Sequence, residues 1–208
     1  MFKAFLRKVL PIKLIWFLGN FIKYKPFLSD VASSERIVEY GWVLQHLPKS
    51  GFILDVGCTG SMFSQQMASL GYKVTGVDRK DYDLVHPNFG FAHCMAEDIT
   101  KCTKFDAITC VSTMEHTAIR EGEYDRTLKA LLGMLSYKGV LLMTVPCGVP
   151  KMFRGHRVFG VNEIPDGDYF ISVRKGMWVK ATKEAVSMVN MTERDYVKAI
   201  ACVVFKNE

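Results

Sequence analysis

The run ILDVGCTGS, residues 53–61, and the later acid Asp78 carry the side chains best suited to ligand chemistry. The apolar residues of this run predict a buried strand that ends at Asp55, and the small residues predict a tight turn into a helix. Backbone N–H groups at such a turn can bind a ligand, and Gly57 and Gly60 let it approach them closely. Asp78 closes a second predicted strand, and its carboxylate can accept hydrogen bonds from both hydroxyls of a ribose. The pattern therefore predicts a pocket for an adenosine-bearing cofactor.

The glycine spacing separates two kinds of cofactor. A dinucleotide-binding turn requires Gly-x-Gly-x-x-Gly, but the later glycine positions hold Thr59 and Met62 when counted from Gly57. The run DVGCTG, residues 55–60, instead resembles the first motif of class I S-adenosylmethionine-dependent methyltransferases. This family often has glycine where the chain has Thr59 and Ser61. The resemblance implies that the first acid of the run contacts the methionine end of the cofactor and that the later acid binds the ribose.

Further segments resemble the family in the order that the family expects. Residues 96–99, AEDI, resemble the segment after the third strand, which reads the adenine edge with an Asp side chain and the next backbone N–H. Residues 112–116, STMEH, resemble the loop after the fourth strand, where many members carry a Glu-His pair. The likeness is good over residues 36–150 and implies S-adenosylmethionine as cofactor. The residues that it assigns to cofactor binding are Asp55, Gly57, Cys58, Thr59, Gly60, Asp78, Arg79, Asp98, Ile99 and Ser112.

Two residues of the Glu-His loop are candidates for the chemical step. Methyl transfer from a sulfonium is an in-line displacement, so the protein has mainly to align the acceptor and exclude water. A hydroxyl acceptor must also lose its proton, which a general base near the transfer point assists. His116 is the candidate base by side-chain type and position, and Glu115 can orient it or replace it. The alternative is that this pair only supports the geometry of the loop.

A polar loop after the fifth predicted strand is a candidate acceptor site. The loop spans residues 151–162 and contains Arg154, His156 and Arg157. His156 is a second candidate base, and the two arginines can hold a phosphate or carboxylate through paired hydrogen bonds. The competing interpretation is that these side chains are solvated at the surface. Histidines and cysteines show no metal-ligand spacing, so we expect no metal site.

Strands and helices alternate along the chain in the order that positions these residues. Such alternation is typical of a parallel sheet covered on both faces, with ligands at the carboxyl ends of its strands. We therefore expect an α/β fold with a mostly parallel sheet, and the resemblance implies a three-layer Rossmann-like methyltransferase sandwich with a C-terminal antiparallel hairpin. Strands are predicted near residues 52–56, 73–77, 91–95, 105–111, 140–145, 168–173, 177–180 and 199–205, and helices near 35–47, 61–70 and 122–136.

Length and composition favour one domain with an N-terminal extension. A chain of 208 residues with 49% hydrophobic content can bury a full core, which we place in residues 31–208. Most of the net charge of +6 belongs to residues 1–30, where six basic residues stand against one acidic residue. The nearly neutral remainder gives no reason to expect a nucleic-acid partner. Six cysteines without a C-x-x-C pair fit a reduced cytoplasm.

The extension combines its basic residues with many apolar and aromatic ones. Pro11, Lys13 and Asn20 interrupt the apolar run, which is too short to cross a bilayer. Such a segment suits the anionic inner face of a membrane or a partner protein. It can equally form helices that cover the sheet edge or the mouth of the pocket. We expect a cytoplasmic protein, located at the inner membrane face if the extension meets lipid.

Taken together, these features predict a methyltransferase that uses S-adenosylmethionine. The segments at residues 112–116 and 139–146 are similar to bacterial methyltransferases found with genes for surface sugars and lipids. The first expectation is therefore O-methylation of a saccharide or lipid-linked precursor. A small metabolite or quinone-like lipid is the alternative acceptor. A different class of function is a non-catalytic partner that keeps the fold and anchors a glycosyltransferase at the membrane.

Overall fold

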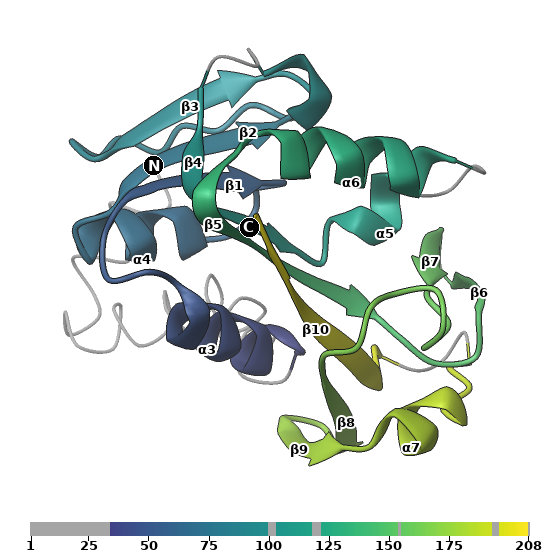
Figure 1. Ribbon diagram of the computed structural model, residues 1–208. Helices are drawn as coiled ribbons and strands as arrows, with labels where there is room; N and C mark the ends of the chain where they lie inside the picture. Colours follow the sequence, from purple (N-terminus) through teal and green to yellow (C-terminus); the bar gives the residue numbers. More distant parts are fainter. Residues whose placement is uncertain (1–33, 100–102, 118–121, 154, 193–195, 208) are drawn as a thin grey trace, which may run out of the picture.

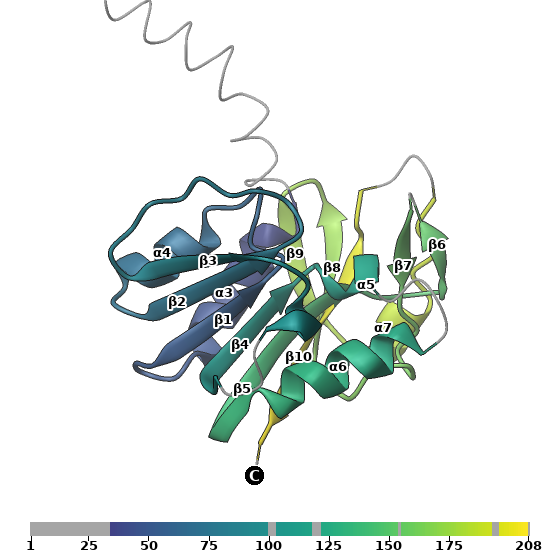
Figure 2. The ribbon, with the colours of Figure 1, turned by 90° about the horizontal axis from the view of Figure 1, so that it is seen from above.

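A twisted sheet with helices on both faces forms the centre of the computed structural model (Figures 1 and 2). The structure describes residues 34–99, 103–117, 122–153, 155–192 and 196–207. The predicted extension at residues 1–30 and the candidate residue Arg154 therefore lie outside the described residues. Among the helices that are described, none has the length and apolar character needed to cross a membrane.

Eight strands form the main sheet in the described part of the chain, in the order β3-β2-β1-β4-β5-β10-β8-β9. The first five run parallel, and β10 inserts antiparallel between β5 and β8. The antiparallel β8–β9 hairpin forms the edge. This arrangement confirms the predicted mostly parallel sheet with a C-terminal hairpin. The strands are β1 Phe52–Val56, β2 Lys73–Asp78, β3 Phe89–His93, β4 Phe105–Val111, β5 Leu135–Pro146, β8 Asp168–Arg174, β9 Met177–Ala181 and β10 Ala199–Lys206.

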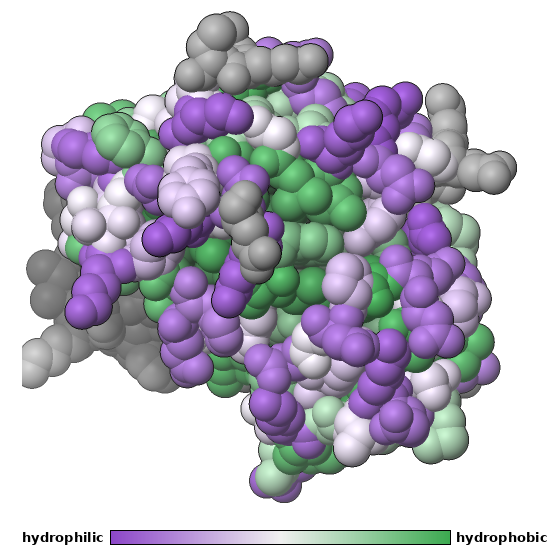
Figure 3. Space-filling model, in the orientation of Figure 1, coloured by the Kyte–Doolittle hydropathy of each residue, from purple (hydrophilic) through white to green (hydrophobic). Residues whose placement is uncertain are grey.

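Side chains alternate between the two faces of the sheet and build two hydrophobic layers. Leu142 of β5 packs in the layer with α3 (Arg36–His46) and α4 (Phe63–Ser69). Leu141, one position earlier, packs in the opposite layer with α5 (Met114–Thr117), α6 (Glu123–Gly133) and α7 (Lys183–Ser187). Successive residues of a strand point to opposite faces, which produces this separation. Apolar side chains reach the surface in the middle of the face seen in Figure 3, with polar ones around them.

The junction between α6 and β5 differs from the sequence prediction. The helix predicted to residue 136 ends at Gly133, and β5 begins at Leu135 instead of residue 140. Lys138 has a φ of 61°, and the β4–β5 register shifts next to it, so the strand continues through a bulge. A Cβ at Gly139 would lie 3.0 Å from the carbonyl oxygen of Phe105. The Lys-Gly pair, which lies between the predicted helix and the predicted strand, is therefore an irregularity inside β5.

The segment predicted as a polar loop contains a short hairpin. Its strands are β6 (Lys151–Phe153) and β7 (His156–Val158), and Gly155 in the turn has a φ of 79°. A bridge between Cys147 and Phe159 ties the hairpin to the end of β5. In Figure 1 the hairpin lies beside α5, so it brings residues 156–158 to the helix that carries the Glu-His pair.

Candidate active site

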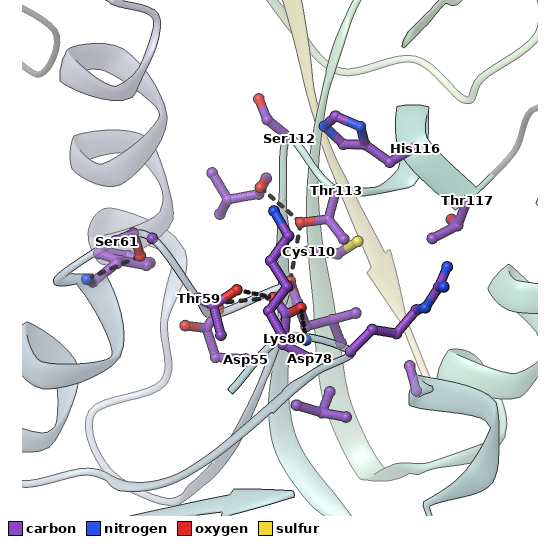
Figure 4. A pocket seen from close by; sticks show the side chains of 18 of the residues that line it. Asp55, Thr59, Ser61, Asp78, Lys80, Cys110, Ser112, Thr113, His116 and Thr117 are labelled. Atoms are coloured by element: carbon purple, nitrogen blue, oxygen red, sulfur yellow. Dashed lines mark hydrogen bonds between the residues drawn. The ribbon is translucent and has the colours of Figure 1, made fainter. Parts of the chain in front are cut away.

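A cleft of about 1320 Å³ opens at the carboxyl ends of β1, β2 and β4. The start of α3, the glycine turn, residues 94–97, the loop after β4 and the first part of α6 also contribute to its wall. Figure 4 shows Asp55, Thr59 and Asp78 close together in this cleft, with Ser112 and His116 beyond them. The carboxyl ends of parallel strands meet at one edge of a sheet, which is why residues distant in sequence gather here.

Asp55 is the buried acid of the cleft, with 4% of its surface exposed. Its carboxylate accepts hydrogen bonds from Ser64 Oγ at 2.5 Å and from Thr109 Oγ1 at 2.7 Å. Burial raises its pKa to about 6, although these two hydrogen bonds act in the opposite direction. β1 runs one residue beyond the predicted end at Asp55, to Val56, and the two protein donors of Asp55 were not predicted from the sequence. The polar Thr109 within the mainly apolar β4 was the available indication.

The glycine turn follows Asp55 directly. Gly57 has a φ of 74°, and a Cβ there would lie 2.3 Å from the Thr113 hydroxyl oxygen, so only glycine fits. Gly60 also has a positive φ, 78°, but a Cβ there would meet open space. The first glycine is therefore required by protein packing. The second leaves free room on the cleft side of the turn.

Asp78 ends β2 and is held by the same turn. Its Oδ2 accepts the Thr59 backbone N–H at 3.1 Å and the Thr59 hydroxyl at 2.6 Å, and its Oδ1 accepts the Lys80 N–H at 3.0 Å. Burial acts to raise its pKa, but the hydrogen bonds from Thr59 and from the Lys80 and Arg79 backbone outweigh it and lower the pKa. Asp78 is therefore ionised at neutral pH and available as an acceptor in the cleft.

A buried network at the other side of the cleft was not anticipated from the sequence. Glu39 of α3 is fully buried and forms an ion pair with Arg36, with Nη1 and Oε2 2.6 Å apart. Its other oxygen accepts hydrogen bonds from Ser112 Oγ at 2.6 Å and Thr144 Oγ1 at 2.7 Å. Ser112 has a φ of 40°, rare for a residue other than glycine. The network thus fixes Arg36 and Ser112, which both line the cleft.

His116 lies at the cleft wall and contacts the second predicted base. Its Nδ1 is 3.0 Å from Nδ1 of His156, and the two rings cross at 81° with centroids 4.3 Å apart. His116 lines the cleft, whereas His156 stands behind it on β7. Burial lowers the pKa of His116, and the nearby His156, Arg36 and Lys80 lower it further. The imidazole of His116 is therefore uncharged at neutral pH.

Glu115, the neighbour of His116, has a different environment. Its side chain is buried, with 3% exposed, and lies outside the cleft wall. Within the described residues its Oε2 has no hydrogen-bond partner. Burial raises its pKa to about 8, so this carboxyl is protonated at neutral pH. A protonated carboxylic acid cannot act as a base, which separates the two members of the predicted pair.

The remaining predicted residues divide between cleft and protein interior. Gly57, Thr59, Gly60 and Arg79 line the cleft, whereas Cys58 is fully buried beside it. Asp98 and Ile99 are outside the wall, and the Ile99 N–H donates to the Ala96 carbonyl. That segment instead offers residues 94–97 to a ligand.

Arg157 pairs with Glu163 at 2.9 Å and stacks on Phe159 at 4.7 Å, so it is engaged within the protein. Within the described ranges, no group of three or more His, Cys, Asp or Glu side chains could hold a metal ion.

Comparison with known proteins identifies the family. The methyltransferase domain family matches residues 34–171, and the chain belongs to it. The chain is 28% identical over 163 residues to a ubiquinone biosynthesis O-methyltransferase of Psychrobacter cryohalolentis, covering 72% of this chain and 58% of that protein. It is 37% identical over 79 residues to the enzyme of the same name from Glaesserella parasuis, covering 31% and 34%. The chain thus spans about a third to three fifths of the length of these relatives.

Among solved structures, the fold is similar to a Burkholderia thailandensis 1,6-didemethyltoxoflavin-N1-methyltransferase with bound 1,6-didemethyltoxoflavin and S-adenosylhomocysteine. The TM-score is 0.60 at 12% identity, with 92% of this chain and 85% of that chain covered. At this identity the likeness supports the fold alone. It confirms the Rossmann-like methyltransferase sandwich that the resemblance implied.

S-adenosylmethionine is the cofactor that the family assignment gives this chain, and the cleft fits it. The ionised Asp78 supplies an acceptor for ribose hydroxyls, and the free space at Gly60 leaves room beside the turn. Arg36 supplies a cation, anchored by Glu39, of the kind that holds a carboxylate. Donors and acceptors for both ends of the cofactor are therefore present in one cleft.

Proposed function

We propose that this protein transfers the methyl group of S-adenosylmethionine to a hydroxyl oxygen of a quinone-like small molecule. The observation that carries this proposal is the place of His116 in the wall of the same cleft as Asp78. Its lowered pKa leaves the imidazole uncharged at neutral pH. An uncharged imidazole there can accept the hydroxyl proton of the acceptor while the new oxygen–carbon bond forms.

Different residues of the cleft would bind the cofactor and accept the proton of the acceptor hydroxyl. Asp78 would hold the ribose, Arg36 the methionine carboxylate and Asp55 the methionine amino group. S-adenosylmethionine, when bound, supplies an electrophilic methyl group on a sulfonium. Arg36 and Lys80, which lower the pKa of His116, also favour the negative charge that grows on the acceptor oxygen. His116 takes the proton, and the remainder of the task is alignment.

The names of the relatives favour the quinone-like acceptor over the saccharide. The sequence alone placed a saccharide or lipid-linked precursor first and a quinone-like lipid second. Both relatives named above are O-methyltransferases of ubiquinone biosynthesis, but they match this chain over only part of their length. Their acceptor is therefore a proposal for this chain, and the saccharide remains an alternative for the same assay.

Cofactor binding tests the enzyme class against the non-catalytic alternative. S-adenosylhomocysteine at saturation should raise the melting temperature, because a ligand of the folded state stabilises it by mass action. Asp78→Ala should remove that shift, whereas Asp83→Ala, which changes an exposed acid outside the cleft wall, should keep it. No shift in the unaltered protein would leave the non-catalytic partner as the better interpretation.

Methyl transfer tests the acceptor. Radiolabelled S-adenosylmethionine should label a catechol carrying a short isoprenoid chain, and His116→Ala should reduce turnover by about 100-fold or more. Binding of S-adenosylhomocysteine should persist in this variant. Label transferred to a lipid-linked saccharide but not to the catechol would refute the quinone-like acceptor while leaving the enzyme class intact.

The basic, apolar extension at residues 1–30 extends this proposal to the membrane. A quinone-like lipid is presented at a bilayer, and six basic residues among aromatic ones suit an anionic surface. The full chain should co-sediment with liposomes containing anionic lipid, and raised salt should weaken this binding. Deletion of residues 2–25 should abolish it. Equal sedimentation of the deletion variant would refute the contact with lipid.

A further inference from the structure

His116 and His156 meet although 40 positions separate them in the sequence. The hairpin that carries His156 is fixed at its far end. The Gly148 N–H donates to the Phe159 carbonyl at 2.9 Å, and the Phe159 N–H donates to the Pro146 carbonyl at 3.0 Å. Arg157 adds the ion pair to Glu163. His156 is thus held in front of α5 by a strand whose ends are anchored to the core.

The contact joins the same atom of both rings, Nδ1 to Nδ1, at 3.0 Å. A hydrogen bond between two imidazole nitrogens requires one N–H and one lone pair, so the two uncharged rings must be in different tautomers. The ring that donates through Nδ1–H keeps its lone pair on Nε2. The other ring keeps its hydrogen on Nε2. His116 therefore has an unprotonated Nε2 only in the arrangement in which it donates through its Nδ1–H.

We propose that His156 is a positioning residue that accepts the hydrogen bond from His116 Nδ1–H, which holds His116 in the tautomer whose Nε2 can take the acceptor proton. This inference rests on the proposed O-methylation. The proton of the acceptor hydroxyl moves to His116 Nε2, the methyl group moves from sulfur to oxygen, and S-adenosylhomocysteine leaves. His116 then carries both N–H groups, with Nδ1–H still bonded to His156, and releases the Nε2 proton to solvent.

The titratable groups that face His116 are compatible with this role. They are Arg36 from α3, Lys80 from the segment after β2 and His156 from β7, and each lowers the pKa of His116. A carboxylate partner would raise that pKa and favour the charged ring. An imidazole partner fixes the tautomer and orientation of His116 while leaving it uncharged. The pair therefore gives orientation without protonating the base.

The tautomer can be measured without any substrate. Long-range ¹H–¹⁵N correlation spectra of the full chain, labelled at histidine, distinguish Nδ1–H from Nε2–H in each ring. We expect His116 as the Nδ1–H tautomer in the unaltered protein. His156→Asn retains an acceptor near the position of Nδ1 and should keep this tautomer. His156→Leu removes the acceptor and should give a mixture, and His86→Leu, a histidine outside the cleft wall, should change nothing.

Turnover supplies the second readout. His156→Leu should lower kcat about tenfold, a part of the contribution expected of a general base, with the KM for S-adenosylmethionine kept. His156→Asn should recover most of that loss. Both variants remove His156, which lowers the pKa of His116, so the rising limb of the pH–kcat profile should move to higher pH in both.

These readouts separate the inference from the function on which it rests. An Nε2–H tautomer for His116 in the unaltered protein, or a spectrum unaffected by His156→Leu, would overturn the positioning role whatever the activity. Equal kcat losses in the Asn and Leu variants would also overturn it. An Nδ1–H tautomer in a protein that binds S-adenosylhomocysteine but methylates no hydroxyl would instead refute the proposed O-methylation.

Discussion

The buried carboxyl of Glu115 predicts a pH-dependent stability that one substitution removes. Burial raises its pKa from an ordinary value of 4.5 to about 8 in the folded protein. The folded state therefore holds a proton that the unfolded chain releases near pH 4.5. The contribution of this group to the free energy of unfolding is fully present below pH 4.5 and is lost as the pH rises through 8. Glu115→Gln keeps the shape of the side chain and cannot ionise.

The size of the effect follows from the two pKa values. Each pH unit costs about 1.4 kcal/mol in the middle of this interval and less near either pKa, so the wild-type protein loses about 3 kcal/mol between pH 5 and pH 8 through this group. Glu115→Gln does not lose it. The difference in free energy of unfolding between variant and wild type should therefore move in favour of the variant by about 3 kcal/mol over that range.

Urea unfolding at pH 5 and pH 8 measures this change directly. Taking the difference between variant and wild type cancels the other titrating groups, including Asp55, whose pKa is also raised. Glu184→Gln is the matched control, because Glu184 is exposed on α7 and its pKa is lowered. The control should give a small change of opposite sign. An unchanged gap for Glu115→Gln would show that Glu115 is ionised at neutral pH, and the argument against it as a base would fail.

Three further substitutions test the cofactor side of the cleft. Thr59→Val removes a hydrogen bond that lowers the pKa of Asp78, so Asp78 should become protonated at a higher pH in the variant. On acidification, stabilisation by S-adenosylhomocysteine should therefore be lost at a higher pH than in the wild type. Thermal shifts measured between pH 3.5 and 6 test this, and coincident curves for the two proteins would contradict it. Gly57→Ala should lower the free energy of unfolding by about 2 kcal/mol or more, since it adds a clash with Thr113 to the strain of a positive φ. Gly60→Ala, with equal strain but open space, should cost only about 1 kcal/mol in urea unfolding, and equal costs for the two would refute the packing argument.

Hydrophobic pattern was sufficient to predict the centre of the sheet. β1 and β4 begin and end at the predicted residues or within one residue of them, because each is a mainly apolar run whose ends are marked by a change in residue type. The pattern failed at β5, which begins two residues after α6 ends at Gly133 and whose residues 136–138 are partly or fully exposed. Whether Lys138 and Gly139 close a turn or form a bulge depends on pairing with β4, a contact distant in sequence.

The candidate site was predictable where a strand end alone defines it. Asp55, Asp78 and His116 line the cleft, and each lies at or shortly after the end of a strand that is recognisable from its own residues. The Glu39 network was not predictable in this way, because its partners Ser112, in the loop after β4, and Thr144, on β5, are distant in sequence. An acid within an amphipathic helix also has an ordinary alternative, a solvated position. Only packing of α3 against β4 and β5 decides that it is buried.

The departure from the family motif at Thr59 is explained by the hydrogen bonds that Thr59 makes. Thr59 stands where relatives often have glycine, which from sequence alone weakens the match to a cofactor turn. In the structure its backbone N–H and hydroxyl both donate to Asp78. The Asp78 carboxylate thus gains the Thr59 hydroxyl as a second donor, while the side chain of Thr59 takes up space beside the turn. Gly60, one residue later, leaves open space. The substitution therefore changes how the ribose acceptor is held while leaving the acceptor itself in the cleft.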